Sequence, residues 1–591
     1  MNIENLLKST IQQALSSLFE VSEQVVLQPT KKDFEGTYTY VTFPLVKQLR
    51  KNPVEIGNAI GNYLLENSKL VSRFNVVQGF LNVSIAESAW IDTLNQIILD
   101  KDFGFLPKNG QSVMVEYSSP NTNKPLHLGH LRNNFLGYSI AQILEANGYD
   151  VVKTCLVNDR GIHICKSMLA YQKHGNGETP ESSGLKGDHL AGKYYVLFDK
   201  DLKQEVADLV AGGMTEDEAK KKAPSMVAAQ EMLIKWEQGD EEVVALWRKM
   251  NDWVFAGFNE TYKKIGVSFD KTYYESNTYL LGKDLVEEGL QKGIFFKKEN
   301  GSVWIDLKEE GLDEKLVLRS DGTSVYITQD LGTTDMKFKD FNNDKSVWVV
   351  GNEQDYHFQV LFAIMKKLGR SYADGCYHLS YGMVDLPSGK MKSREGTVVD
   401  ADDLVEEVRS EAENVAKERG DIANMTTEEQ QNLYSIVGLG ALKYFLLKVD
   451  PKSRMLFNPQ ESVQLQGNTG PYIQYTHARI CSVLRKAEAM QVPINQAVTV
   501  SELHQVEADL IYLIGQYPST IQQAAADYSP AVIAQFAYEL AKTFNQFYAE
   551  VSILNEPNTN KLQFRIALSK TIAETIAKAM KLLGIDVPQR M

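Results

Sequence analysis

The segment that most constrains the fold runs from residue 112 to residue 157, where strand-like and helix-like hydrophobic patterns alternate. Residues 112–117 are mostly apolar and rich in strand-forming types, which predicts a strand buried in a parallel sheet. Residues 128–146 carry apolar side chains at helical spacing and stop at Asn147-Gly148, a signal for the end of a helix. A second apolar run at 151–157 predicts another strand. The segment therefore predicts a strand, loop, helix, strand unit of an α/β domain.

Two histidines lie where the loop of this unit becomes the helix. His127 and His130 are one helical turn apart, and Gly129 lies between them. A helix N-terminus offers unpaired backbone N–H groups and the positive end of the helix dipole to an anion. A glycine lets a phosphate or a flat base approach the backbone closely. The turn is therefore a candidate phosphate site, although solvated histidines beside a helix start fit the bare pattern equally well.

A second unit of the same kind follows later in the chain. The apolar run 346–350 ends at Gly351, a helix is expected over 355–368, and residues 376–383 predict another strand. The chain then enters a polar, basic, glycine-flanked loop at 386–397. Two such units predict the halves of a nucleotide-binding doubly wound sheet, whose ligands lie across the carboxyl ends of the strands. The histidine turn and the basic loop would then flank one triphosphate.

Residues 175–269 interrupt this α/β pattern. Charged helical runs at 206–236 and 241–265 predict a helical insertion into the domain rather than a new catalytic unit. After it the sheet is expected to resume. The strands predicted there, with an Asp-Gly hairpin turn before the last, are 302–307, 316–319 and 324–328.

At 591 residues the chain is too long for one core. Residues 1–108 read as an α+β domain, 109–402 as a Rossmann-like catalytic domain, and 403–591 as a helical bundle. The fold class expected is thus multidomain α/β, with a doubly wound parallel sheet, a helical insertion, an N-terminal α+β domain and a C-terminal all-α bundle. Helices expected in the last domain are 433–449, 470–490, 502–526, 529–554 and 562–583.

Composition limits the class of protein. With 43% hydrophobic and 23% charged residues, the composition is that of an ordinary globular protein. The sequence has no apolar run of membrane-spanning length, and its N-terminus lacks a basic region followed by an apolar one. The chain is therefore expected to be cytoplasmic, with no membrane partner. The net charge of −14 argues against non-specific binding of nucleic acid but permits local basic patches. The four cysteines are scattered without a Cys-x-x-Cys pair, so neither a disulfide framework nor a structural zinc is expected.

The two signature segments resemble those of a known family. His-Leu-Gly-His at 127–130 and Lys-Met-Lys-Ser-Arg at 390–394 resemble the HIGH and KMSKS signatures of class I aminoacyl-tRNA synthetases. Four further segments narrow the resemblance to the arginyl-tRNA synthetase family. They are residues 116–127, which lead into the first signature, and 326–332, 354–357 and 470–479. The resemblance covers nearly the whole chain, including an N-terminal domain that in this family contacts the tRNA elbow.

This resemblance implies an arginine-tRNA ligase. It would form arginyl-adenylate and pyrophosphate from arginine and ATP, with Mg²⁺ on the triphosphate, and then transfer arginine to the 3′-terminal ribose of tRNA(Arg). A monomer is expected. Neither step needs a covalent nucleophile of the enzyme, so alignment and stabilisation of phosphate charge should carry catalysis.

The resemblance also implies residue roles. The expected catalytic residues are Lys124, His127, His130, Lys390 and Lys392. The expected ATP-binding residues are His127, Gly129, His130, Met391, Ser393, Gly351 and His357. The expected arginine-binding residues are Glu116, Asn121, Glu275, Tyr326, Asp330 and Gln354. The residues expected to help bind tRNA are Gln474, Tyr475 and Arg479.

Chemistry supports the carboxylates in this set independently. A guanidinium requires planar acceptors, ideally carboxylates in a desolvated pocket, which Asp330 and Glu275 would supply. Glu116 ends a buried strand, where an unpaired charge is costly. The basic loop departs from the family signature, because Ser393 stands where its most important lysine is expected. Lys124 is predicted to compensate, with Lys390 and Lys392 as the alternatives.

Other functions fit less well. A cysteinyl enzyme recognises its substrate through zinc, and the sequence has no metal-ligand cluster. A glutamyl enzyme would want a basic pocket in place of Asp330 and Glu275. A simple nucleotidyltransferase shares the histidine turn but needs no large helical domain. A non-catalytic RNA-binding paralogue is disfavoured by the intact Lys124, His127 and His130.

Overall fold

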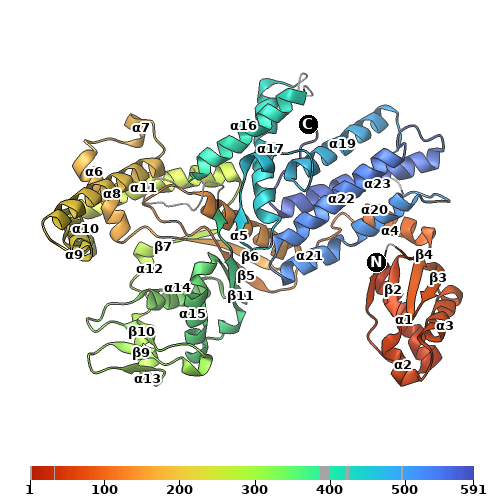
Figure 1. Ribbon diagram of the computed structural model, residues 1–591, viewed down its shortest axis with the longest axis horizontal. Helices are drawn as coiled ribbons and strands as arrows, with labels where there is room; N and C mark the ends of the chain where they lie inside the picture. The colour runs from red at the N-terminus through yellow and green to blue at the C-terminus, as the bar shows by residue number, and fades with distance from the viewer. Residues whose placement is uncertain (1–2, 32, 386–398, 420–424, 494–496) are drawn as a thin grey trace.

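The structure, a computed structural model, describes all residues except 1–2, 32, 386–398, 420–424 and 494–496. Its centre is a five-stranded parallel sheet in the order β12-β11-β5-β6-β7 (Figure 1). The strands are β5 (Ser112–Glu116), β6 (Asp150–Val157), β7 (Lys271–Tyr274), β11 (Lys345–Gly351) and β12 (Cys376–Tyr381). The strand that comes first in the chain is central and the order reverses on either side of it, which confirms the doubly wound sheet.

Both predicted strand, helix, strand units are present. Helix α5 (Leu128–Ala146) joins β5 to β6, and α15 (Asp355–Lys367) joins β11 to β12. A 3-10 turn, η2 (Asn352–Gln354), precedes α15. The edge strand β7 was not predicted, because four residues of mixed polarity give no clear periodicity.

The segment between β7 and β11 departs from the prediction. The runs at 302–307 and 316–319 do form strands, but these belong to a separate antiparallel sheet rather than to the main one. Its order is β10-β9-β8, with strands β8 (Phe295–Lys297), β9 (Val303–Ile305) and β10 (Lys315–Leu318). Helices α12 (Glu275–Thr278) and α13 (Lys283–Gln291) precede this sheet.

The predicted strand at 324–328 was wrong. Only Ser324 bridges to β10, and α14 (Tyr326–Phe341) begins two residues later. The β-branched residues in this stretch favour a strand locally. Packing of α14 against α13 and α15 decides the outcome, so tertiary context overrides propensity.

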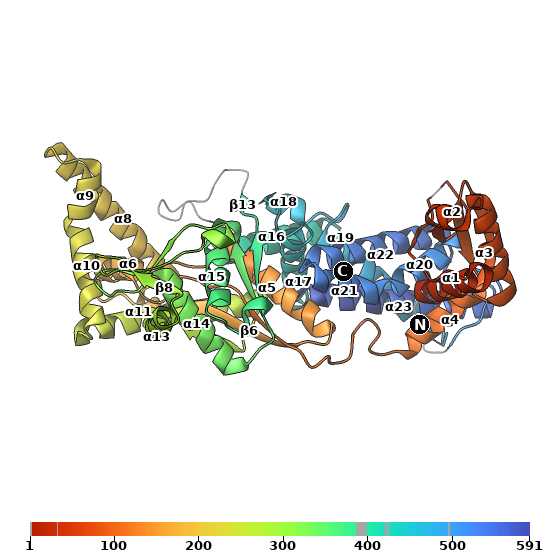
Figure 2. The ribbon, with the colours of Figure 1, turned by 90° about the horizontal axis from the view of Figure 1, so that it is seen from below.

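The insertion between β6 and β7 is helical, as predicted, but is divided differently. The single helix expected at 206–236 was wrong, because Gly212-Gly213 and Pro224 break it. The helices are α6 (Ile162–His174), α7 (Pro180–Ser183), α8 (Gly187–Ala211), α9 (Glu216–Lys222), α10 (Pro224–Glu237) and α11 (Glu241–Ile265). Figure 2 shows them at one end of an elongated molecule.

The N-terminal residues form an antiparallel sheet covered by helices at the other end of the molecule (Figure 2). The sheet order is β1-β2-β4-β3, with strands β1 (Leu27–Pro29), β2 (Tyr38–Val41), β3 (Val71–Val77) and β4 (Phe80–Ile85). The helices are α1 (Ile3–Phe19), α2 (Phe43–Leu49), α3 (Pro53–Asn67) and α4 (Glu87–Leu99).

The C-terminal part is a helical bundle, as predicted. The helix expected at 502–526 is in fact two helices, because Pro518 begins a new one. The bundle helices are α16 (Ala401–Arg419), α17 (Thr427–Leu447), α18 (Pro459–Ser462), α19 (Gly470–Ala489), α20 (Gln505–Gly515), α21 (Tyr517–Ala526), α22 (Pro530–Glu550) and α23 (Thr559–Leu582). Among the described helices, none is both long and apolar enough to cross a bilayer.

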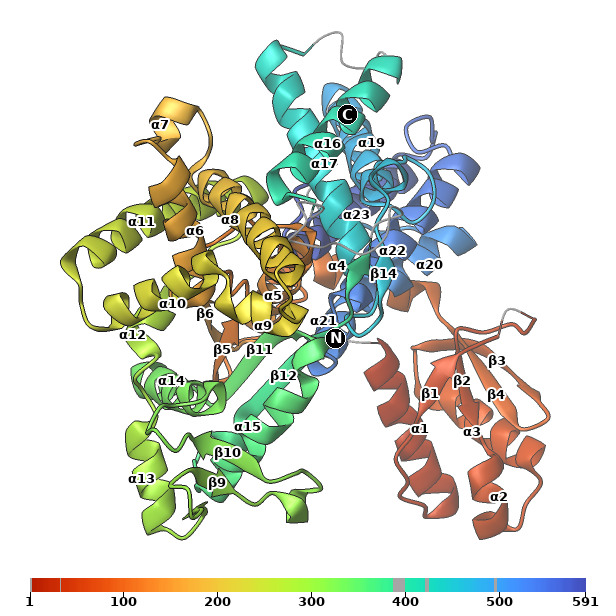
Figure 3. The same cartoon turned by 60° about the vertical axis from the view of Figure 1, so that its left-hand side comes forward.

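Helix α5 joins the sheet to the bundle. It packs against β5, β6 and β11 on one side and against five bundle helices on the other, and most of its residues are buried. The α5–bundle junction lies near the middle of the molecule (Figure 3). The buried Arg132 on α5 donates to the carbonyls of Leu446, Pro451 and Ser453, which follow or end α17. The helix that begins at the histidine turn is thus held from both sides.

Candidate active site

The carboxyl ends of β5, β6, β7 and β11 open onto one large cavity of about 990 Å³, called here the strand-end cavity. All six residues predicted to bind arginine line it, together with His357: Glu116, Asn121, Glu275, Tyr326, Asp330 and Gln354. This is the place where doubly wound sheets bind their ligands. The structure therefore brings together residues that lie up to 238 positions apart.

Glu116 is buried at the end of β5 and is already paired. Its carboxylate accepts a hydrogen bond from the ammonium of Lys337 on α14, and both side chains are almost fully buried. Lys337 also lines the cavity. A buried carboxylate without a counter-charge would be strongly disfavoured, so Lys337 offsets the cost of burying Glu116 there.

Asp330 and Tyr326 lie one turn apart on α14, where both face the cavity. The Asp330 carboxylate is 2.7 Å from Nε2 of His357, on α15. Tyr326 is 75% exposed, so it stands at the rim rather than inside. Tyr326 and Asp330 are therefore neighbours because they lie one turn apart on a helix. The strand predicted at 324–328 does not form there.

Glu275 is half-buried at the start of α12, directly after β7. Burial raises the pKa of its carboxyl, and the nearby guanidinium of Arg160 opposes this shift. Arg160 itself was not predicted as a site residue. Asn121 and Gln354 are exposed at the cavity mouth and complete the predicted set.

The histidine turn forms the N-terminal cap of α5. His127 Nδ1 accepts from the Gly129 N–H at 3.1 Å, and His130 Nδ1 accepts from the His127 N–H at 3.1 Å. The proton of each neutral ring is therefore assigned to Nε2, where it can be donated to a phosphate oxygen. A Cβ on residue 129 would lie 3.0 Å from the His127 ring, so glycine lets that ring fold over the turn.

Both rings are neutral near pH 7. Burial lowers the pKa of His127 to about 3, helped by the positive charge of Lys124. Burial also holds the pKa of His130 well below its ordinary value. The ring centroids are 4.0 Å apart, so two imidazolium charges would repel each other strongly. The two histidines are thus arranged as hydrogen-bond donors rather than as cations.

Lys124 and His127 line a second, smaller cavity of about 220 Å³, called here the Lys124 cavity. Burial lowers the pKa of the Lys124 ammonium, which has no hydrogen-bond or ion-pair partner among the residues that the structure describes. The other basic side chains lining this cavity are paired: Lys193 with Glu178, and His189 with Asp400. An incompletely solvated, unpaired cation beside two donor histidines is an arrangement suited to an anion.

The predicted basic loop residues Lys390, Met391, Lys392 and Ser393 lie outside the described residues. The segments on either side of that loop are described. Before it, β13 (Val384–Asp385) pairs with β14 (Met455–Leu456) of the bundle. After it, the Leu128 N–H donates to Val399 O at 3.2 Å and the Ala401 N–H donates to Leu126 O at 2.9 Å. The chain that leaves the loop therefore pairs with the histidine turn.

Two other residues predicted to bind ATP, Gly351 and His357, lie near the carboxyl end of β11. Gly351 ends β11 beside Met383 and Tyr381, and a Cβ there would lie 3.8 Å or more from either side chain. His357 lines the strand-end cavity on the same side of the sheet.

The residues predicted to contact tRNA lie on α19. Gln474 is fully buried, and its amide donates to Ile436 O and Asp586 O inside the bundle. Tyr475 and Arg479 are partly exposed, and the Arg479 guanidinium lies 4.9 Å from the centre of the Tyr475 ring. The structure thus brings two of the three to the surface and uses the third to join α19 to the C-terminal residues.

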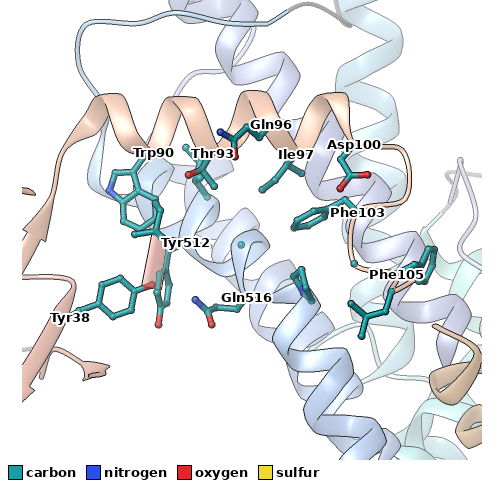
Figure 4. A pocket seen from close by; sticks show the side chains of 16 residues that line it. Tyr38, Trp90, Thr93, Gln96, Ile97, Asp100, Phe103, Phe105, Tyr512 and Gln516 are labelled. Atoms are coloured by element: carbon teal, nitrogen blue, oxygen red, sulfur yellow. The ribbon is translucent and has the colours of Figure 1, made fainter. Parts of the chain in front are cut away.

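A further cavity of about 310 Å³ lies where the N-terminal sheet and α4 meet the end of α20 (Figure 4). It is bounded by Tyr38 of the N-terminal sheet, Trp90 of α4, and Tyr512 and Gln516 at the end of α20. None of the predicted site residues lines it. The six residues predicted to bind arginine line the strand-end cavity instead.

Three family models match the chain. "tRNA synthetases class I (R), catalytic domain" matches residues 93–458, "DALR anticodon binding domain" matches 473–591, and "Arginyl tRNA synthetase N terminal domain" matches 5–85. Together they span nearly the whole sequence.

Curated relatives match over their full length. The "Arginine--tRNA ligase" of Amoebophilus asiaticus is 56% identical over 596 residues, and that of Bacteroides thetaiotaomicron is 56% identical over 597 residues, each alignment covering 100% of both chains. Among solved structures, the arginyl-tRNA synthetase of Thermus thermophilus has a TM-score of 0.80 at 25% identity and covers 99% of this chain and 100% of its own. That of Plasmodium falciparum, at 20% identity and TM-score 0.76, shares the fold over 100% of this chain and 99% of its own.

Proposed function

The chain belongs to the arginyl-tRNA synthetases of class I and is thus an arginine-tRNA ligase that uses ATP. On this basis we propose that the strand-end cavity and the Lys124 cavity bind different parts of the substrates. The strand-end cavity binds arginine and the nucleoside of ATP. The Lys124 cavity and the histidine turn bind the triphosphate. The convergence of six predicted arginine-binding residues on one cavity is the observation that carries this proposal.

In this proposal the guanidinium of arginine lies between Glu275 and Asp330. Both carboxylates offer planar acceptors, and Tyr326 at the rim closes over the side chain. Glu116, Asn121 and Gln354 hold the α-amino and carboxylate groups. The Lys337 ammonium is paired with the Glu116 carboxylate before the substrate arrives.

The first step joins the arginine carboxylate to the α-phosphorus of ATP and releases pyrophosphate. His127 and His130 donate Nε2 protons to phosphate oxygens, and the Lys124 ammonium stabilises the negative charge that grows on the leaving pyrophosphate. Lys390, Met391, Lys392 and Ser393 would approach the same phosphates from the basic loop. Gly351 and His357 lie beside the nucleoside.

The second step transfers arginine to a terminal ribose hydroxyl of tRNA(Arg). Residues 403–591, with Tyr475 and Arg479 among the contacts, bind the anticodon side, and residues 1–108 bind the tRNA elbow. Gln474 supports α19 from inside. Residues 109–402 hold the reaction centre. The enzyme acts as a cytoplasmic monomer in this proposal.

Mg²⁺ would arrive with ATP. Asp400 is the one carboxylate among the described residues that line the Lys124 cavity, and it already pairs with His189. A single engaged carboxylate does not form a magnesium cage, so the triphosphate oxygens would hold the ion. No step of the proposal passes through it.

ATP–pyrophosphate exchange with each of the twenty amino acids, with and without tRNA(Arg), tests the assignment. We expect exchange with arginine alone among them, and we expect it to require the tRNA, as in the family. Exchange with another amino acid in the absence of tRNA would overturn the proposal.

A further inference from the structure

The short helix α12 carries Glu275 and is held at both ends by two adjacent residues, Asp159 and Arg160, that follow β6. Asp159 is 2% exposed. Its carboxylate accepts from the Ser276 backbone N–H at 2.8 Å and from the Ser276 hydroxyl at 2.6 Å. These bonds fix the first turn of α12 at the residue directly after Glu275.

Arg160 acts on the other end of the same helix. Its guanidinium carbon lies 3.9 Å from the centre of the Tyr279 ring. The Tyr279 N–H in turn donates to the Glu275 carbonyl at 2.9 Å and closes the turn. A guanidinium stacked on an aromatic face at this distance is a favourable and geometrically specific contact. The two residues therefore restrict how Glu275 can be oriented.

The same two residues also contact the helical insertion. Arg160 forms an ion pair with Glu237 at 2.6 Å and lies 5.3 Å from the Trp236 ring, both at the end of α10. The Asp159 carbonyl accepts from Trp247 Nε1 at 2.6 Å and from Asn251 Nδ2 at 3.1 Å, on α11. Asp159 and Arg160 thus connect α10 and α11 to α12, the helix that carries the Glu275 carboxylate.

Charge supports the same arrangement. Burial raises the pKa of Glu275, Asp159 and Asp330 raise it further, and Arg160 lowers it. The Arg160 side chain is only 10% exposed, and its Nε is buried without a hydrogen-bond partner among the described residues. The charged and titratable groups that line the strand-end cavity are Glu116, Arg160, His163, Glu237, Glu275, Tyr279, Lys283, Arg319, Tyr326, Asp330, Lys337 and His357.

We propose that Asp159 and Arg160 are positioning residues that set Glu275 for the guanidinium of arginine, and that through Arg160 the helical insertion takes part in arginine recognition. This rests on the proposed function, in which Glu275 binds arginine. It gives the insertion a role in the amino acid site that the signature motifs do not indicate.

The test compares Arg160→Met, Arg160→Lys and Glu275→Gln in arginine-dependent ATP–pyrophosphate exchange by the full chain with tRNA(Arg). Arg160→Met should raise the KM for arginine about tenfold, since it removes one charge and one stacked contact, and leave kcat and the KM for ATP within about twofold. Arg160→Lys keeps the charge without the planar stack and should recover part of the loss. Arg248→Met, an exposed arginine on α11, is the matched control.

The pH profile separates positioning from folding. Arginine binding requires the Glu275 carboxylate, so the KM for arginine should rise as pH falls through the pKa of Glu275. Without the Arg160 charge that pKa is higher, so the rise should begin at a higher pH in Arg160→Met than in the unaltered enzyme. A merely structural defect would lower the active fraction, and with it kcat, without moving this profile.

The outcomes are distinguishable. An unchanged KM and pH profile in Arg160→Met, together with a raised KM in Glu275→Gln, would overturn the positioning role and leave the proposed function standing. An unchanged KM in Glu275→Gln would instead show that the proposed arginine site is wrong. Thermal melting of each variant identifies any that fail to fold, and in that case Arg160→Lys carries the comparison.

Discussion

The two cavities at the strand ends differ in how the chain balances their charges. In the strand-end cavity the carboxylates that we propose to bind arginine already have cations or donors of the chain beside them: Lys337 beside Glu116, His357 beside Asp330, and Arg160 near Glu275. In the Lys124 cavity the ammonium of Lys124 has no such partner among the described residues. The carboxylates of the strand-end cavity therefore have partners before any substrate binds, whereas Lys124 in the other cavity keeps an unpaired positive charge among the described residues.

The ligands that we propose for the two cavities would account for this difference. Carboxylates that share a cavity repel one another, and the neighbouring cations and donors of the chain offset this repulsion before a guanidinium arrives. A polyphosphate brings its own negative charge, so an internal partner for Lys124 would only compete with it.

Lys124→Met should lower the exchange rate most, by about 10²–10³-fold, because it removes an electrostatic group aimed at charge that develops in the transition state. The KM for arginine should change little, because Lys124 does not line the strand-end cavity. Lys200→Met, an exposed lysine on α8, is the control. Near-normal exchange in Lys124→Met would transfer the role to Lys390 or Lys392.

Lys337→Met should destabilise the catalytic domain by about 3 kcal/mol, because it leaves the buried Glu116 carboxylate without a counter-charge. Thermal or denaturant unfolding measures this. Lys339→Met, an exposed position on the same helix, should have almost no effect. Adding Glu116→Gln to Lys337→Met should recover part of the loss, and failure to recover any would show that the pair is not what holds this region.

Asp330→Asn should raise the KM for arginine by roughly 10–30-fold, because it removes a charged acceptor while keeping the shape and the contact with His357. Steady-state exchange kinetics measure both substrates. The KM for ATP serves as the internal control and should stay constant. An equal rise in both KM values would mean that the two cavities do not separate the substrates.

The smallest effect concerns alkaline pH. Burial lowers the pKa of Lys124, so the ammonium is present below that value and is lost as pH rises, at a lower pH than for an exposed lysine. The exchange rate should therefore decline on the alkaline side. Lys124→Arg stays protonated and should remove the decline, even where its rate near pH 7 is about twofold lower. The same decline in both enzymes would assign the titration to another group.

The sequence predicted the parts of this site that depend on local pattern. Both strand, helix, strand units and the cap of α5 at the histidine turn follow from hydrophobic periodicity and helix-start signals. The resemblance strings contain five of the six residues expected to bind arginine, all but Glu275. The doubly wound topology explains why Glu116, Asn121, Glu275 and Gln354, which end or follow strands, lie at the same edge of the sheet.

The charge-balancing residues could not be predicted in this way. Lys337 is 221 positions from Glu116, and Glu237 is 77 positions from Arg160, so no local spacing connects these partners. The predicted strand at 324–328 was wrong because the β-branched residues there favour a strand locally, whether they lie in a strand or at the start of a helix. Only the packing of α14 makes Tyr326 and Asp330 neighbours at helical spacing.

A crystal structure of the enzyme with arginine and a non-hydrolysable ATP analogue tests the central contrast most directly. We expect the arginine guanidinium within hydrogen-bond distance of Glu275 and Asp330, with Lys337 still paired to Glu116, and the Lys124 ammonium bonded to phosphate oxygens. A guanidinium bound away from both carboxylates, or a triphosphate that leaves Lys124 without contact, would contradict it.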